Sequence, residues 1–452
     1  MPRTVGTRFV LLVVGYFALQ LVLRLLIGPS LELDEAEAFF HARQLSWGYG
    51  AQPPFYFWLQ WALFQVVGEG LFALALLKAL ILAGTVIGLF LLLREEVGDE
   101  AGAVAALSLG LLPQVMWEGQ RALTHSMLAL LMAVVTAGLA VRALRSGHWR
   151  DHLGLGVAVG LGVLSKFNFA LWPVGLLLAA AALPAWRLRP LRILAAVGAA
   201  VAVVAPVGIW MWRNPDLSTA SLEKLEVATD GAIMARLIGT GEVVGAALAF
   251  LALAAVVLGV FWLKAGQGGG RSLGPVGRLL GAAAGLSFLC LWLGILATGA
   301  TEIAERWLLP FAWAVVPVGV LLLWPGMAAR AQRGLAGAVG ALWLIAMAAL
   351  PYASLVDPGW RGAEFGPLVQ RLEEMGAGER GLRVQSQWVA ANIALIAPGM
   401  EPRLLKRGEA PGAGVVLVLD EAGLPGSEGS RESFVIPRGQ TDVRVALATA
   451  AE

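Results

Sequence analysis

The chain has 452 residues, of which 58% are hydrophobic and only 14% are charged, against about 25% charged residues in typical soluble proteins. This composition excludes a soluble globular protein. The 33 basic and 31 acidic residues nearly balance, so the dense positive surface that nucleic acids require is not expected. The single cysteine, Cys290, excludes an intrachain disulfide and a cysteine-based metal cluster.

Apolar stretches long enough to span about 30 Å of hydrocarbon recur along the chain. No small-residue cleavage site follows the first of them, so we expect a retained helix rather than a signal peptide. We predict an all-α polytopic membrane protein with about eleven transmembrane helices. They cover residues 9–27, 70–93, 99–116, 122–143, 152–166, 168–184, 191–212, 237–263, 277–298, 307–324 and 334–352.

The distribution of positive charge predicts the orientation. With the N-terminus in the cytoplasm, fourteen Lys and Arg residues lie in cytoplasmic loops and seven in the opposite loops. The positive-inside rule favours this arrangement, and an odd number of helices then sends the C-terminus outside.

The composition changes after the last apolar stretch. Residues 353–452 hold 13 acidic and 10 basic residues, an ordinary density for a soluble domain. We therefore divide the chain into a transmembrane domain, 1–352, and a small extracytoplasmic domain, 353–452. In the latter, 414–420 is typical of a buried strand and 365–376 of an amphipathic helix, which favours an α/β fold.

The first extracytoplasmic loop, residues 28–69, opens with a cluster of carboxylates. Two short interfacial helices are expected here, separated by the Pro53-Pro54 pair. We interpret Glu32 and Glu37 as solvated charges. Asp34 follows a hydrophobic span and precedes an interfacial helix, so it could lie in a partly dry cleft and act as a base.

Other outer helix ends carry ionisable groups, which are costly near the membrane and are therefore functional candidates. Each of the cations Arg121, Lys166 and Arg306 alone is explained by snorkelling to the interface. Together, on the same side as the acidic cluster, they suggest an anionic ligand such as a lipid phosphate. The remaining candidates for the pocket or the acceptor site are His41, Gln52, Glu118, His125, Glu302 and Glu305.

The sequence leaves a metal unassigned. A divalent cation could bind carboxylate oxygens of Asp34 or Glu35, although nothing in the sequence demands one. The four histidines do not have the spacing of metal ligands.

Four segments resemble bacterial members of the GT-C superfamily of glycosyltransferases that use polyprenyl-phosphate sugars. The resemblance is to glycosyltransferase family 39, the protein mannosyltransferase and lipid A aminoarabinose transferase group. The segments are LDEAEAFFHARQLSWGYGAQPPFYFWLQW (33–61), LLPQVMWEGQRALTHSMLAL (111–130), GLGVLSKFNFAL (160–171) and ERWLLPFAW (305–313).

The resemblance implies an inverting transfer of a sugar from a polyprenyl-phosphate donor at the outer face of the bacterial inner membrane. Asp34 matches the catalytic aspartate, whose implied role is general base, and Glu35 is its implied partner. Lys166 and Arg306 match positions that place positive charge against the lipid phosphate, with Arg121 in the same pocket. The acceptor is a lipid, a polysaccharide intermediate or a protein.

Two positions depart from the family pattern. Gln52 stands where relatives often carry a basic residue, so the phosphate clamp is expected to differ. His125 lies in a segment where many relatives carry an aspartate, and it is a possible substitute as an acceptor or orienting group.

Two other functions fit the same architecture. A secondary transporter or lipid flippase also has many helices and buried ionisable groups, but it should show inverted repeats or paired broken helices. A scaffold that binds polyprenyl lipid without catalysis is the third possibility, and the retained Asp34 and Glu35 argue against it.

Overall fold

The computed structural model describes residues 3–218, 232–264, 272–405, 415–420, 432–438 and 442–449. The chain divides into two compact units, each built from segments that are separate in the sequence. The first unit comprises Met1–Ala18, Ser46–Tyr56 and Lys78–Ala346, and the second comprises Leu19–Leu45, Phe57–Leu77 and Met347–Glu452.

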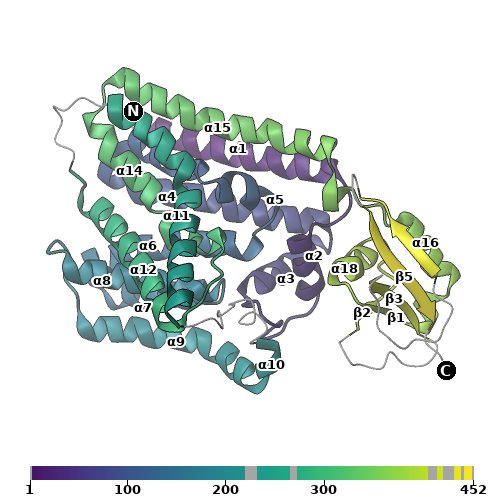
Figure 1. Ribbon diagram of the computed structural model, residues 1–452. Helices are drawn as coiled ribbons and strands as arrows, with labels where there is room; N and C mark the ends of the chain where they lie inside the picture. Colours follow the sequence, from purple (N-terminus) through teal and green to yellow (C-terminus); the bar gives the residue numbers. More distant parts are fainter. Residues whose placement is uncertain are drawn as a thin grey trace. The chain divides into compact units, whose positions relative to one another are not determined.

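The first unit is a bundle of apolar helices, in which α7 packs extensively on α9, α8 on α12, and α6 on α7 (Figure 1). Its long helices are α4 (Leu71–Leu107), α6 (Thr124–Ser146), α7 (Trp149–Val163), α8 (Leu171–Ala182), α9 (Pro190–Arg213), α11 (Ala232–Lys264), α12 (Pro275–Thr298) and α14 (Val315–Leu323). Short helical turns connect them: η1 (Ser108–Leu111), η2 (Gln114–Glu118), α5 (Gly119–Arg121), η3 (Phe167–Ala170), α10 (Pro215–Ser218), η5 (Glu305–Trp307), α13 (Leu309–Ala312) and η6 (Trp324–Gly326). α1 (Arg3–Ile27) and α15 (Ala329–Val356), like α4, contribute residues to both units.

The expectation of a multi-pass membrane protein is confirmed. Within the described residues, eight helical segments are long and apolar enough to cross a membrane, and the chain is a multi-pass membrane protein.

The expected number of eleven spans is not confirmed. Two expected spans, 70–93 and 99–116, fall in one helical run that is interrupted at Gly98. Its φ of 83° lies in a backbone region that other residues rarely adopt. Two more, 152–166 and 168–184, correspond to α7 and α8, whose 15 and 12 residues are fewer than the roughly 20 needed to cross the hydrocarbon upright.

The second unit combines the helices of the first loop with the C-terminal segment. α2 (Leu33–Ala42) and most of α3 (Phe55–Val67) are the two expected loop helices. The C-terminal helices are α16 (Gly366–Glu374), α17 (Ala377–Arg380) and α18 (Gln387–Ile396), preceded by the turn η7 (Gly359–Gly362).

The C-terminal segment also forms a five-stranded mixed sheet in the order β2-β1-β3-β5-β4. The strands are β1 (Leu382–Val384), β2 (Pro402–Leu404), β3 (Val416–Asp420), β4 (Glu432–Ile436) and β5 (Val443–Thr449). β1 pairs in parallel with β2 and β3, whereas β5 pairs antiparallel with β3 and β4. Figure 1 shows α16 and α18 beside this sheet. The expected helix at 365–376 and the expected strand at 414–420 are present as α16 and β3. A domain boundary after residue 352 stays a prediction.

Candidate functional site

Residues expected to bind an anion meet around Lys166 in the first unit. The Nζ atom of Lys166 donates hydrogen bonds to Oγ of Ser126 at 2.7 Å and to the backbone carbonyl of Arg306 at 3.2 Å. Nδ2 of Asn168 donates to the backbone carbonyl of Trp307 at 2.7 Å. We call Ser126, Lys166, Asn168, Arg306 and Trp307 the Lys166 cluster. It joins three segments that lie far apart in the sequence.

A fourth segment reaches the same region through the backbone. The amide N–H of Phe55 donates to the carbonyl of Leu164 at 3.0 Å, two residues before Lys166. Because Pro53 and Pro54 lack an N–H, Phe55 is the first residue after them that can make this contact. The Pro-Pro pair thus places the start of α3 against the end of α7.

The loop that carries Arg121 is held by a lysine that the sequence analysis did not select. Nζ of the buried Lys78 donates to the backbone carbonyls of Arg121 and Ala122, both at 3.1 Å. The next residue, Leu123, has a φ of 59°, a conformation that costs a non-glycine residue about 1–3 kcal/mol. The Arg121 guanidinium lies 5.6 Å from the Trp117 ring centroid. A lone lysine within the apolar stretch 70–93 was the available signal.

Two further candidates lie close to this region of the first unit. The ring of buried His125 has its centroid 5.4 Å from that of Tyr56. Glu305 accepts a hydrogen bond from Nε2 of Gln114 at 2.6 Å. These contacts connect the 111–130 segment with Tyr56 and Glu305.

The remaining candidates of the first unit are at least partly accessible. Glu118 and Glu302 are exposed, and Gln52 is half-buried. Arg306 is also exposed, and its guanidinium forms no ion pair within the part of the chain that the structure describes. Its side chain is thus accessible to an anion, and its backbone carbonyl accepts a hydrogen bond from Lys166.

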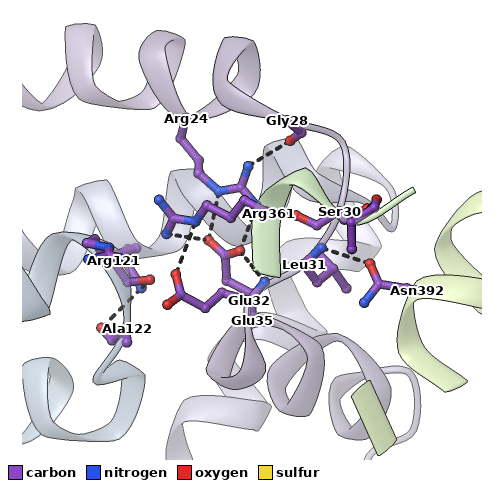
Figure 2. Close-up of polar contacts among 12 residues, drawn as sticks. Arg24, Gly28, Ser30, Leu31, Glu32, Glu35, Arg121, Ala122, Arg361 and Asn392 are labelled. Carbon is purple, nitrogen blue, oxygen red and sulfur yellow. Dashed lines mark hydrogen bonds and ion pairs between the residues drawn. The ribbon is translucent and has the colours of Figure 1, made fainter. Parts of the chain in front are cut away.

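The second unit contains the acidic candidates of the first loop, and its neighbouring carboxylates Asp34 and Glu35 differ in their burial. The carboxylate of buried Glu35 accepts hydrogen bonds from Arg24 Nε at 2.9 Å, Arg24 Nη2 at 2.6 Å, Arg361 Nη2 at 3.3 Å and the Glu32 N–H at 3.0 Å (Figure 2). Arg361 Nε also forms an ion pair with Glu32 at 3.2 Å. We call Arg24, Glu32, Glu35 and Arg361 the Glu35 cluster. Asp34 is half-buried in the first turn of α2.

Glu35 is therefore compensated by protein groups on both of its oxygens. The bond between its carboxylate and the Glu32 N–H also forms half of a capping box, which starts α2 at this position. No group of three or more His, Cys, Asp and Glu side chains that could hold a metal occurs among the described residues.

His41 lies in the last turn of α2, half-buried, with its ring centroid 5.1 Å from that of Phe57. Burial lowers the pKa of His41 to about 4. The imidazole is therefore neutral at pH 7 and can accept or donate one hydrogen bond.

Sequence reasoning missed Arg24 and Arg361. Arg24 interrupts the first apolar stretch, which is a recognisable signal for a buried ion pair. Arg361 lies within the turn η7 of the C-terminal segment, and nothing in its local sequence distinguishes it from a surface arginine.

Comparisons with known proteins agree with this architecture. A family model described as dolichyl-phosphate-mannose-protein mannosyltransferase matches residues 51–210. The lipopolysaccharide core galacturonosyltransferase RgtA of Rhizobium johnstonii is 37% identical over 327 residues, covering 70% of this chain and 64% of RgtA. RgtB of the same organism is 36% identical over 311 residues, covering 66% of this chain and 62% of RgtB. The matched region thus spans a little under two thirds of the length of these relatives.

Solved structures share the fold across nearly the whole chain. The structure of ArnT from Cupriavidus metallidurans in the apo state has a TM-score of 0.65 at 13% identity, covering 96% of this chain and 97% of ArnT. ArnT bound to undecaprenyl phosphate has a TM-score of 0.63 at 12% identity, covering 97% of this chain and 98% of ArnT. At this level of identity the likeness concerns the fold.

Proposed function

Because the chain belongs to the GT-C superfamily of glycosyltransferases, we propose that it transfers a sugar from a polyprenyl-phosphate donor to a cell-envelope acceptor. The Lys166 cluster is the observation that carries this proposal. It places the Lys166 ammonium and the backbone of the exposed Arg306 where four separate segments meet, and two cations on these segments are suited to the phosphate of a lipid-linked donor. The undecaprenyl phosphate bound by the similar ArnT supports a donor of this class.

In the proposed reaction, Asp34 is the general base. It takes the proton of an acceptor hydroxyl while that oxygen forms a bond to the anomeric carbon of the sugar. The bond from that carbon to the phosphate oxygen breaks, and polyprenyl phosphate leaves with the electron pair, so the anomeric configuration inverts. Lys166 and Arg306 stabilise the negative charge that develops on the leaving phosphate, and Arg121 contributes to the same pocket.

Glu35 has a different proposed role from the one implied by the family resemblance. Its oxygens bind Arg24, Arg361 and a backbone N–H, so it holds the helix that carries Asp34 rather than contacting substrate or a cation. His41, Gln52, Glu118, His125, Glu302 and Glu305 remain proposed pocket residues.

Two relatives support a choice among the possible sugars and acceptors. RgtA and RgtB are named as lipopolysaccharide core galacturonosyltransferases. We therefore place a hexuronic acid first among the donors, ahead of hexoses and aminopentoses, and a lipopolysaccharide core first among the acceptors. The reaction takes place on the extracytoplasmic side of the bacterial inner membrane in this proposal.

A secondary transporter or lipid flippase is the alternative function. It is disfavoured because the polar candidates lie at helix ends and in the first loop, whereas transporters build their sites on broken helices at the middle of the membrane.

The test uses purified protein in lipid vesicles with labelled polyprenyl-phosphate sugars and three acceptors: lipopolysaccharide core, lipid A and a secreted protein. We expect Asp34→Asn to lower kcat by about 10²–10⁴-fold, as loss of a general base does. Lys166→Met should weaken binding of polyprenyl phosphate. Arg278→Gln is the matched control, because Arg278 is an exposed cation in the first turn of α12. Folded wild-type protein that neither binds nor consumes any donor contradicts the proposal.

A further inference from the structure

The first turn of α2 is tied to the C-terminal segment by a buried set of charges. Arg24 and Arg361 approach the Glu35 carboxylate together, as Figure 2 shows. Exposed fractions of these three side chains are 8%, 8% and 4%. Such burial is costly for an isolated charge, but here two guanidinium groups balance two carboxylates.

Arg361 contacts the carboxylates on both sides of Asp34 in the sequence. Its Nε pairs with Glu32 at 3.2 Å and its Nη2 with Glu35 at 3.3 Å. Glu32 precedes α2 as its N-cap, and Glu35 occupies the third helical position. The planar guanidinium therefore restrains two points of one helical turn, which limits the rotation of that turn about the helix axis.

Backbone contacts reinforce the same connection. Nε1 of Trp388 donates to the Leu31 carbonyl at 2.6 Å, and the Leu31 N–H donates to Oδ1 of Asn392 at 2.8 Å. Gly28 lies against the backbone of Arg361, since a Cβ atom on Gly28 would be 2.3 Å from the Arg361 carbonyl oxygen. α18 and the turn η7 thus hold the residues that lead into α2.

We propose that Arg361 is a positioning residue, through which the C-terminal segment holds the first turn of α2 in the orientation that presents Asp34 to the acceptor. This inference rests on the proposed function of Asp34. It makes the C-terminal segment part of the catalytic apparatus, although Arg361 contacts neither substrate nor the reacting atoms. The cluster carries no net charge, because its two arginines offset Glu32 and Glu35, so its effect on Asp34 is chiefly geometric.

A kinetic experiment tests the positioning role. Arg361→Gln should lower kcat by roughly 100-fold, the size of effect that a small misplacement of a catalytic group produces, while the KM for the lipid donor changes little. Arg361→Lys keeps the positive charge but loses the planar guanidinium that contacts Glu32 and Glu35 at the same time. We therefore expect a kcat between those of the wild type and Arg361→Gln. Arg361→Gln and Glu35→Gln should be non-additive, because each breaks the same contact.

The matched control is Arg371→Gln. Arg371 lies in the same C-terminal segment and pairs with Glu432 at 2.7 Å and with Glu374 at 2.8 Å, but this network is exposed. We expect Arg371→Gln to have wild-type kcat. An equal loss of activity in Arg371→Gln would mean that any weakening of the segment impairs the enzyme, and it would overturn the specific role of Arg361.

A second readout does not depend on enzymatic activity. A spin label attached to Asp34→Cys, in a Cys290→Ala background, reports the mobility of the first turn of α2. We expect Arg361→Gln to increase that mobility and Arg371→Gln to leave it unchanged. Unchanged mobility together with unchanged kcat in Arg361→Gln overturns the inference. Increased mobility in a protein that shows no transfer with any donor would instead leave the connection intact and contradict the proposed function.

Discussion

The buried charged side chains Glu35 and Lys78 form hydrogen bonds or ion pairs with other groups of the protein. Glu35 is surrounded by two arginines and a backbone N–H, and Lys78 donates to two backbone carbonyls. Because a buried ion that loses its partner costs about 3–5 kcal/mol, each of these residues constrains the backbone that it contacts. The constrained segments are the start of α2 and the loop that carries Arg121.

His41 should make the stability of the protein depend on pH. Burial lowers its pKa to about 4 in the folded protein, against an ordinary value of 6.5 for an exposed histidine. Between these values the unfolded state binds more protons, so stability falls as the pH is lowered from 6.5 toward 4. We expect the thermal denaturation midpoint of His41→Phe to depend less on pH between 6.5 and 4 than that of the wild type. The same change at exposed His148 should leave the profile unaltered, and a profile that is equally steep in His41→Phe contradicts this prediction.

Small residues determine how closely the helices of the first unit approach one another. A Cβ atom on Gly156 of α7 would lie 2.1 Å from the carbonyl oxygen of Ala196 on α9. Likewise, a Cβ atom on Gly175 of α8 would lie 2.1 Å from Oγ of Ser287 on α12. Such contacts are typical of helix packing within membranes, where close backbone approach replaces hydrophobic burial as a source of stability.

Gly156→Ala should therefore separate α7 from α9. The added methyl group meets backbone rather than a flexible side chain, so we expect a destabilisation of about 1–3 kcal/mol, seen as a lower thermal midpoint in detergent. Gly154→Ala is the control on the same helix, because nothing lies within 4 Å of a Cβ atom there. It should leave the midpoint unchanged or raise it slightly, since alanine favours a helix. Equal midpoints for the two variants would show that α7 and α9 can adjust at no cost.

The distribution of charge along the chain predicts the orientation of the molecule in the membrane. Lys and Arg number fourteen in the loops assigned to the cytoplasm and seven in the opposite loops. The Lys166 cluster and the first loop are assigned to the extracytoplasmic side. The connection between α6 and α7 is assigned to the cytoplasm. This assignment agrees with the proposed reaction, which requires the donor phosphate and Asp34 on one side.

Reporter fusions test this orientation. Alkaline phosphatase, which is active only outside the cytoplasm, should be active when fused after residue 452 and inactive when fused after Gly147. A green fluorescent protein fusion, which is fluorescent only in the cytoplasm, should give the reverse pattern. Alkaline phosphatase activity at Gly147 would reverse the orientation and contradict the proposed placement of the site.

Local sequence was sufficient for the class of the protein and for many of its elements. The long apolar stretches determine membrane helices because burial of apolar residues is a property of each stretch alone. Every expected span contains helix in the structure, and the Pro-Pro pair marks the start of α3. The number of spans was harder to predict from the sequence. A helix of 12 or 15 residues, such as α8 or α7, is distinguished from a full span by where it begins and ends, and these positions depend on neighbouring turns.

Only the tertiary structure decided which charged groups meet. Glu35 and Arg361 are 326 positions apart, and the residues around them carry no pattern that links them. Likewise, the partners of Lys78 are backbone carbonyls, which every residue possesses, so no sequence motif could identify them. A contact of this kind depends on how distant segments pack. The composition of the chain therefore determined that it lies in a membrane, and its packing determined that Glu35 meets Arg24 and Arg361 at the start of α2.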